Sequence, residues 1–205
     1  MKRESIKYVA DIRSGYQFRG KVEPSDDPNV SVIQIKDLSD RLGTSPGETI
    51  EIQLGDLVPV RLDNPAPHFL RPGDVLFLSR GHRQIAAVFT GTETDTIAAS
   101  YFFVLRPDPQ KIDPAFLAWF INQTEFQEKL RPLSYGTHMQ LVSISDFKDL
   151  TVVVPPFPVQ YAILELQNLV DRERQLTTLL REKRERLVLA VSQQLLSGQR
   201  KLKDN

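Results

Sequence analysis

The sequence predicts an α+β fold, in which a compact mixed-sheet domain is followed by a long C-terminal coiled-coil helix. Short runs rich in Val, Ile and Phe recur about every 8–12 residues over the first half of the chain, a spacing typical of a curled sheet. Asp113-Pro114 marks a helix start, because Asp is a favoured N-cap and Pro is favoured at the first helical position. Residues 159–197 contain neither Pro nor Gly, so they permit one helix of about 39 residues, roughly 58 Å long.

We expect two parts, a compact domain over residues 1–156 and a long helix with a polar tail over residues 157–205. The chain has 205 residues, with 26 basic and 26 acidic side chains and no Cys. The lack of Cys excludes disulfides, thiol nucleophiles and Cys-ligated metal centres. No apolar stretch approaches the roughly 20 residues that span a bilayer, and the N-terminus has no apolar signal-like region. These features predict a soluble cytoplasmic protein that does not bind membranes.

The N-terminal third is expected to contain one short helix and three short strands. Ser5 is placed to cap a helix that runs to Ile12. Polar, Pro-containing stretches at 23–29 and 64–67 should form loops, since each Pro disfavours helix in the residue before it. The expected strands are Val30–Ile35, Thr49–Leu54 and Leu57–Leu62.

A tight turn at Arg71–Asp74 opens the central part of the predicted sheet. Pro72 suits the second position of this turn and Gly73 the third. A second turn is expected at Arg80-Gly81. The three strands expected around these turns are Val75–Ser79, Ile85–Thr90 and Ile97–Leu105.

The end of the domain is predicted to be mostly helical. The helix that begins at Asp113-Pro114 should run to about Leu130, before Pro132, and its apolar residues repeat at a spacing that packs it against the sheet. Ser145 is expected to cap a further short helix, which precedes a strand at Leu150–Val154.

The long helix carries a narrow apolar stripe. Ten positions between 162 and 194 alternate in spacings of four and three residues, and seven of the ten residues there are apolar. These ten are Ala162, Leu166, Leu169, Glu173, Leu176, Leu180, Lys183, Leu187, Ala190 and Gln194. A 3-4 spacing sustained over this length predicts a coiled-coil seam. Val191 and Leu195 imply a register shift at the end of the stripe. The residues expected to contact a partner helix are Leu166, Leu169, Leu176, Leu180, Leu187 and Val191. An alternative is a helix that folds back on its own domain.

The charge is unevenly distributed along the chain. Residues 1–155 carry 17 basic and 20 acidic side chains, a net of −3, whereas residues 156–205 carry 9 and 6, a net of +3. Three stretches of the predicted domain contain no acid: Ile12–Val22, Val75–Thr92 and Lys129–Ser145. Together they would suffice to form a binding face for an anionic partner, although clustering of this size also arises by chance.

Loops within these stretches combine aromatic, hydroxyl, amide and basic side chains, the groups that contact DNA bases and phosphates. The candidate residues are Tyr16, Arg19, Lys21, Arg80, His82, Arg83, Tyr135, Thr137, His138 and Gln140. Contact with bases is expected for the last four and for Arg80 and Arg83. The alternative for each loop is an ordinary solvent-exposed turn.

Signals for catalysis are weak. Asn64-Pro65-Ala66-Pro67 is similar to the Asn/Asp-Pro-Pro-aromatic loop of amino-methyltransferases, but it lacks the second adjacent Pro and the aromatic residue. Pro107-Asp108 lacks the acidic partner of a nuclease metal motif, and the three His residues lack zinc-ligand spacing. No Gly-x-Ser-x-Gly elbow is present. We therefore predict no catalytic centre, no metal site and no cofactor.

Several of these segments together make the chain resemble the specificity subunits of type I restriction–modification systems. The matching segments are Leu70–Gly81, Pro114–Leu117, Ser134–Thr137, Ile144–Phe147 and Val154–Pro156. Gln160 and Ile163 then open the helix, as in the family's Pro-Pro-x-x-x-Gln pattern. The resemblance extends over essentially the whole chain, and the order of five individually loose motifs makes it specific.

The resemblance implies a non-catalytic subunit that recognises double-stranded DNA. In this family, tandem target-recognition domains are each followed by a long spacer helix, and the paired helices set the distance between two half-sites. Separate modification subunits methylate adenine, and separate restriction subunits cleave. The implied partners are DNA, adenine methyltransferase subunits and, indirectly, a restriction subunit.

The chain departs from this family in three respects. It holds one recognition domain and one helix, about half of the usual unit. A homodimer with antiparallel helices would restore the layout and read a palindrome split by a spacer. Val159 stands where the family usually has an acidic residue before Gln160. The predicted domain is net negative, so the methyltransferase is expected to supply phosphate contacts.

Two other functions remain open on these residues. One is a protein-interaction adaptor that docks an enzyme through its helix and binds no DNA. The other, weaker, is a DNA-modifying enzyme with a degenerate motif.

Overall fold

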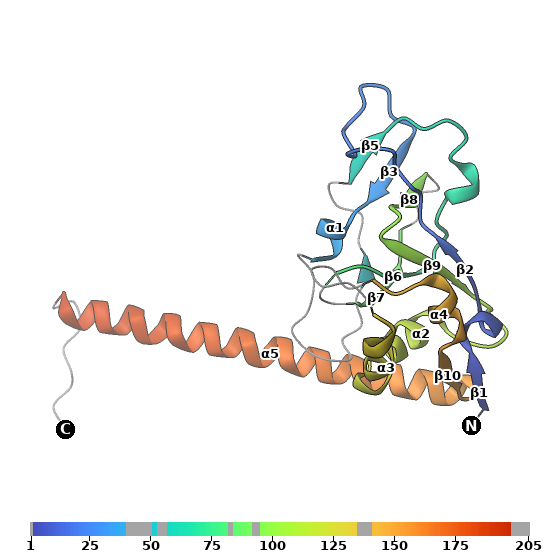
Figure 1. Cartoon of the computed structure of the whole chain (residues 1–205). Helices are drawn as coiled ribbons and strands as arrows, with labels where there is room; N and C mark the ends of the chain where they lie inside the picture. Colours follow the sequence, from blue (N-terminus) through green and yellow to red (C-terminus); the bar gives the residue numbers. More distant parts are fainter. Residues whose placement is uncertain are drawn as a thin grey trace. The chain divides into compact units, whose positions relative to one another are not determined.

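The computed structural model describes residues 2–39, 51–52, 57–81, 84–91, 95–134 and 141–197 (Figure 1). The chain divides into two compact units, Met1–Glu165 and Leu166–Asn205. The first unit combines mixed sheets with short helices, and the second contains most of a long C-terminal helix. The predicted α+β fold class is thereby confirmed.

A five-stranded sheet with the strand order β2-β9-β6-β7-β4 forms the centre of the first unit. β4 runs parallel to β7, and the other neighbouring strands are antiparallel. The strands are β2 (Ala10–Ser14), β4 (Glu51–Ile52), β6 (Val75–Leu78), β7 (Ala86–Phe89) and β9 (Phe102–Pro107). Every residue of β6 and β7 is buried, which fits their continuous apolar sequences.

The first unit also contains a three-stranded sheet with the order β5-β3-β8. Its strands are β3 (Val30–Ile33), β5 (Val58–Val60) and β8 (Thr96–Ala98). β3 ends at Ile33, two residues earlier than predicted, because the helix α1 (Ile35–Ser39) begins at Ile35. The Asp37 carboxylate accepts a hydrogen bond from the Gln34 N–H at 2.7 Å, so it stabilises the first turn of this helix.

The helix predicted from Ser5 to Ile12 is wrong. Lys2–Ser5 forms β1, Ile6–Tyr8 forms a 3₁₀ turn, and the chain then enters β2. β1 pairs antiparallel with β10 (Thr151–Val154), with Lys2 opposite Val154 and Ser5 opposite Thr151. Pairing with a strand from the far end of the unit therefore outweighs the local capping signal. Ser5 makes no side-chain cap in the structure.

The turn predicted at Arg71–Asp74 is confirmed. Gly73 has φ +88°, a conformation that Gly adopts without steric cost. The Asp74 carboxylate is buried and accepts hydrogen bonds from the Arg71 N–H and, in a bidentate pair, from the Arg106 guanidinium at 2.7 and 2.8 Å. The hydrogen bond and charge of Asp74 raise the pKa of Arg106.

Asp113 caps α2 (Pro114–Ile121) as predicted, because its carboxylate accepts hydrogen bonds from the N–H groups of the first turn. The single helix predicted to reach Leu130 is interrupted, however, and α3 (Thr124–Leu130) is separate. The buried Asn122 side chain bonds both backbone groups of Ala86 at 2.8 Å, in the manner of an added strand. This interaction, which links the end of α2 to β7, ends the helix.

Three further predictions are corrected by the structure. Ser143 caps α4 (Ile144–Asp149) by accepting a hydrogen bond from the Asp146 N–H, so the cap is not Ser145. The strand predicted at Ile97–Leu105 is divided into β8 and β9, which belong to different sheets. Residues 64–67 are not wholly irregular, since Ala66–His68 forms a 3₁₀ turn.

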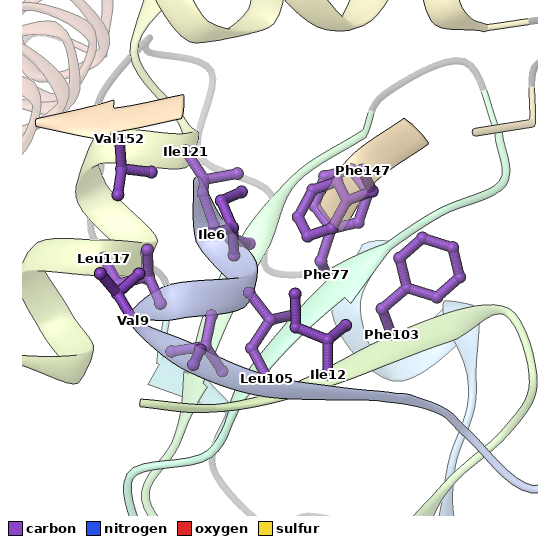
Figure 2. Close-up of a cluster of buried hydrophobic side chains, with 14 of the residues drawn as sticks. Ile6, Val9, Ile12, Phe77, Phe103, Leu105, Leu117, Ile121, Phe147 and Val152 are labelled. Atoms are coloured by element: carbon purple, nitrogen blue, oxygen red, sulfur yellow. The ribbon is translucent and has the colours of Figure 1, made fainter. Parts of the chain in front are cut away.

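The largest core cluster lies between the five-stranded sheet and the helices (Figure 2). Phe147 of α4 stacks on Phe77 of β6 with ring centroids 4.3 Å apart. Phe103 packs against the Phe147 ring at a centroid distance of 5.5 Å. Offset and tilted aromatic pairs of this kind stabilise a core beyond simple burial.

The long helix α5 (Phe157–Leu196) spans the boundary between the two units. Its first two turns belong to the first unit, where Ile163 and Leu164 pack against the core and Gln160 is fully buried. The predicted long helix is confirmed, with a start two residues before Val159 because Pro158 is tolerated in a first helical turn. Among the described helices, none is both long and apolar enough to cross a membrane.

Candidate nucleic-acid interface

The turn between β8 and β9, residues 99–101, connects the two larger sheets, and we refer to it as the sheet-linking turn. It is closed by a hydrogen bond from the Phe102 N–H to the Ala99 carbonyl at 3.0 Å. The Ala99 N–H in turn donates to the Ile33 carbonyl of β3. All three acid-free stretches of the sequence are connected around this turn.

The first acid-free stretch is bonded directly to both sides of the sheet-linking turn. The Gly15 N–H donates to the Phe102 carbonyl at 2.9 Å, and the Tyr16 N–H donates to the Ala98 carbonyl at 2.7 Å. A Cβ atom on Gly15 would collide with the Ala99 carbonyl. Close backbone approach therefore requires Gly at this position.

Tyr16 is half-buried in a small aromatic cluster. Its ring meets the rings of Phe18 and His68 edge-on, with centroids 4.9 and 5.0 Å apart. Arg19 and Lys21, by contrast, are exposed, and Lys21 lies 4.0 Å from Glu23. Two of the three residues predicted here are thus available at the surface, whereas much of Tyr16 is engaged in packing.

Arg13 and His68 support this aromatic cluster. The Arg13 guanidinium donates to the His68 and Phe69 carbonyls at 3.2 and 3.0 Å. Burial lowers the pKa of Arg13. Burial, and secondly the charge of Arg13, lower the pKa of His68. Both effects favour a neutral imidazole beside Tyr16.

The second acid-free stretch meets the sheet-linking turn through Tyr101. Ser79 donates to the Tyr101 carbonyl from its backbone N–H at 2.9 Å and from its hydroxyl at 2.8 Å. The Arg80 guanidinium lies over the Tyr101 ring, 5.5 Å from the centroid, within cation–π range. Among the described residues, this guanidinium has no hydrogen bond or ion pair, and its Nε is a buried donor without a partner. Within the described part of the chain, its hydrogen-bonding capacity is therefore unused.

The third acid-free stretch is tied to the second at two points. Arg80 forms an antiparallel bridge with Leu141, and the Val142 N–H donates to the Ser79 carbonyl at 3.1 Å. The Ser134 hydroxyl donates to the side-chain carbonyl of the buried Gln84 at 3.0 Å. The segments that flank positions 82–83 and 135–140 are consequently held next to each other.

Six of the predicted contact residues lie outside the described residues. They are His82, Arg83, Tyr135, Thr137, His138 and Gln140. Their role in DNA contact stays a prediction, as does that of Arg19, Lys21, Tyr16 and Arg80.

Three residues at or beneath this surface are not among the contact residues predicted from the sequence: Tyr101, Ser134 and the buried Gln84. Tyr101 is 39% exposed, although it lies within the strand predicted at Ile97–Leu105. Ser100, just before it, is a weak local signal for a turn. Gln84 and Ser134 stand at the edges of the acid-free loops and are recognisable only from their mutual hydrogen bond.

The chemistry of this surface is that of binding. It presents guanidinium and ammonium donors, an aromatic ring and hydroxyl groups, which are suited to phosphates and base edges. In the described part of the chain, no three His, Asp or Glu side chains converge as metal ligands.

The second unit offers a different surface, the apolar stripe of α5. Its predicted seam residues Leu166, Leu169, Leu176, Leu180 and Leu187 are each more than half exposed, and Val191 is half-buried. An open, largely apolar hollow of about 410 Å³ lies along one part of the stripe, between Leu169 and Leu180. A contiguous exposed apolar surface of this kind marks an interaction site.

The model of the family described as "Type I restriction modification DNA specificity domain" matches residues 2–185. No curated protein matches the chain.

Three solved structures share its fold. One comes from a study of complex assembly and conformational transition of the type I R-M system, with a TM-score of 0.67 and 16% identity over 96% of this chain and 44% of that chain. The type I restriction-modification S subunit from M. genitalium gives a TM-score of 0.54 and 17% identity, over 96% of this chain and 46% of that chain. The HsdS subunit from Thermoanaerobacter tengcongensis gives a TM-score of 0.59 and 14% identity, over 84% of this chain and 37% of that chain. The chain thus spans less than half the length of each.

Proposed function

The chain belongs to the family of type I restriction–modification DNA specificity domains, and on that premise we propose that it recognises a DNA sequence for a restriction–modification methyltransferase complex. The observation that carries the proposal is the family match, which extends through the recognition unit and into α5. The proposed partners are double-stranded DNA, adenine methyltransferase subunits and, through them, a restriction subunit.

We place DNA contact on the surface around the sheet-linking turn. Arg80 has no hydrogen-bond partner among the described residues, and its guanidinium lies over the Tyr101 ring, an arrangement that limits its side-chain freedom before binding. An arginine so oriented is suited to the O6 and N7 acceptors of guanine in the major groove. The exposed Arg19 and Lys21 are suited to phosphates, which would fix the register of the protein on the duplex.

The hydrogen bonds and the β-bridge between the second and third acid-free stretches support a single DNA-contacting surface. The residues that flank positions 82–83 and 135–140 lie near one another, because Ser79, Arg80 and Gln84 contact Val142, Leu141 and Ser134 respectively. Base contact is proposed at these positions through Arg83, Tyr135, Thr137, His138 and Gln140, and DNA contact also through His82.

A homodimer is proposed as the working form. One recognition unit would contact one half-site. The exposed apolar seam of α5 would be buried by pairing with a second helix. A second copy would present a second, symmetry-related recognition unit, so the target would be a palindrome interrupted by a spacer.

Affinity is expected to depend on the methyltransferase. Residues 1–155 have a net charge of −3, whereas nonspecific attraction to DNA comes from excess Lys and Arg near the phosphates. The isolated chain should therefore bind DNA weakly, and the complex should bind it tightly with a steep salt dependence.

The test is DNA binding by the chain alone and by its complex with the co-expressed methyltransferase subunits. The complex should select one sequence from a random duplex pool, and the Arg80→Ala variant should lose discrimination at one or more positions of that sequence. A complex that forms but shows no sequence preference would overturn the proposal in favour of an adaptor that docks an enzyme without reading DNA.

A further inference from the structure

Two charged residues interrupt the apolar seam of α5. Glu173 and Lys183 occupy heptad positions that are otherwise filled mainly by Leu and Ala. Charges at such positions would be buried when a partner helix packs on the seam, and an unpaired buried charge is costly. The identity of the residue opposite each charge therefore decides which pairing is stable.

Neither residue is satisfied along its own helix. Within the described part of the chain, the ion pairs of α5 join Arg174 to Asp171 and Arg181 to Glu185. Glu173 and Lys183 take part in none of them. Both side chains are exposed, and Glu173 also lines the apolar hollow of the stripe.

The positions of the seam are symmetric about residue 178. When two copies of α5 are placed antiparallel with Thr178 at the centre, each of the ten heptad positions from 162 to 194 faces another of the ten, whereas Val191, where the stripe shifts register, lies outside this set. Opposite pairs are Leu176 with Leu180, Leu169 with Leu187, Leu166 with Ala190, and Ala162 with Gln194. In this register Glu173 faces Lys183, and the contact occurs twice because of the two-fold symmetry.

Other pairings of two α5 helices place Glu173 and Lys183 opposite an apolar residue or a like charge. A parallel pair in register places Glu173 against Glu173 and Lys183 against Lys183. An antiparallel pair shifted by one heptad places Glu173 against Leu176 or Ala190, and Lys183 against Leu166 or Leu180. A polar residue within a seam commonly sets register and orientation in this way.

We propose that α5 pairs with α5 of a second copy in antiparallel orientation, centred on residue 178, with Glu173 of each helix opposite Lys183 of the other. This proposal rests on the homodimer of the proposed function and specifies its partner surface. Charge complementarity selects a second copy as the occupant of the stripe, because its own sequence supplies the opposite charge at the required position.

Charge reversal tests the pairing. The variants Glu173→Lys and Lys183→Glu each place like charges opposite each other in both layers, so each should raise the dimer Kd roughly 10- to 100-fold. The double variant E173K/K183E restores opposite charges and should return the Kd to within a few-fold of the unsubstituted chain. Glu182→Lys, which makes the same charge change off the seam, is the matched control. Sedimentation equilibrium measures all four, and a double variant as weak as the single ones would overturn the register.

Disulfide trapping tests the orientation independently, since the chain contains no Cys. Positions 173 and 183 of opposite helices would lie in one layer, whereas two copies of position 173 would lie about 15 Å apart along the axis. Disulfides require Cα atoms within about 7 Å. A mixture of Glu173→Cys and Lys183→Cys chains should therefore cross-link under mild oxidation, while each variant alone should not. Cross-linking of each variant alone, without any 173–183 product in the mixture, would establish a parallel pair and overturn the proposal.

The outcomes separate this inference from the proposed function. A chain that stays monomeric at micromolar concentration would overturn both the register and the homodimer. A dimer with a different cross-linking pattern would overturn the register alone. Sequence-selective DNA binding by the methyltransferase complex is measured separately and would be unaffected by a wrong register.

Discussion

Gln160 is the residue that joins the start of α5 to the first unit. Its side-chain carbonyl accepts a hydrogen bond from the Asp113 N–H at 2.8 Å, and its amide donates to the Lys111 and Pro155 carbonyls at 3.1 and 2.8 Å. The side chain is fully buried. The Pro-Pro-x-x-x-Gln pattern thus has a physical basis, because only an amide provides both an acceptor and two donors here.

Replacement of Gln160 by Ala should lower the free energy of unfolding by about 2–4 kcal/mol, because three buried or partly buried backbone groups lose their partner. Gln160→Glu should also destabilise, since it loses both donors. Urea denaturation followed by far-UV circular dichroism measures the change. Val159→Ala, at an exposed neighbour, should change stability by less than about 0.5 kcal/mol. Equal effects at 159 and 160 would contradict the hydrogen-bonding role.

Tyr101 is the candidate interface residue that the structure adds. If its ring orients Arg80, Tyr101→Ala should weaken sequence-specific DNA binding by the complex by roughly 3- to 30-fold, whereas Tyr101→Phe should bind normally. Fluorescence anisotropy with specific and random duplexes distinguishes the two. Tyr161→Ala, which removes an exposed ring from α5, is the control. A Tyr101→Ala complex with unchanged specificity would remove Tyr101 from the interface.

His68 should make stability depend on pH. Its pKa in the folded chain is lowered from 6.5, first by burial and second by Arg13, so the unfolded chain binds the proton more readily. The contribution of neutral His68 is fully present above about pH 6.5 and is lost as the pH falls through the lowered folded value. The stability difference between the unsubstituted chain and His68→Asn should therefore shrink as the pH is lowered from above about 6.5 to below the folded pKa of His68. Parallel pH profiles of the two proteins in urea denaturation would refute this.

At the scale of elements, the segment after β2 is held by backbone hydrogen bonds to the sheet-linking turn. Gly15→Ala should cost roughly 1–3 kcal/mol or displace this segment, because the new methyl group meets the Ala99 carbonyl. Gly20→Ala is a matched control in the same loop, since a methyl group there would have no other atom within 4 Å. Thermal unfolding should separate the two variants clearly, and equal melting temperatures would show that the segment is not held as described.

The elements also show where local signals suffice. Asp113 caps α2 and Gly73 supplies the turn because both effects depend on residues a few positions away. The break between α2 and α3 has no such signal, because it is caused by Asn122 bonding to Ala86, 36 positions earlier. Local capping preferences likewise failed at Ser5, where strand pairing with β10 decided the structure.

At the scale of the whole molecule, the symmetry of the dimer should appear in the DNA. The methyltransferase complex should select inverted half-sites from a random duplex pool, separated by a spacer of constant length. A variant with Leu176→Glu and Leu180→Glu, which disrupts the centre of the seam, should retain half-site preference but lose the requirement for two half-sites. High-throughput sequencing of the selected pools measures both. Selection of a direct repeat would contradict a two-fold symmetric dimer.

The sequence by itself determined the fold class, the extent of α5, its 3-4 seam and the charges within that seam, because these depend on composition and short-range periodicity. It also marked three acid-free stretches. Only the tertiary structure decided that these stretches meet around the sheet-linking turn, and that Arg80 rests on Tyr101. The reason is that their contacts are hydrogen bonds and ring contacts between residues distant in the chain, which no local pattern encodes.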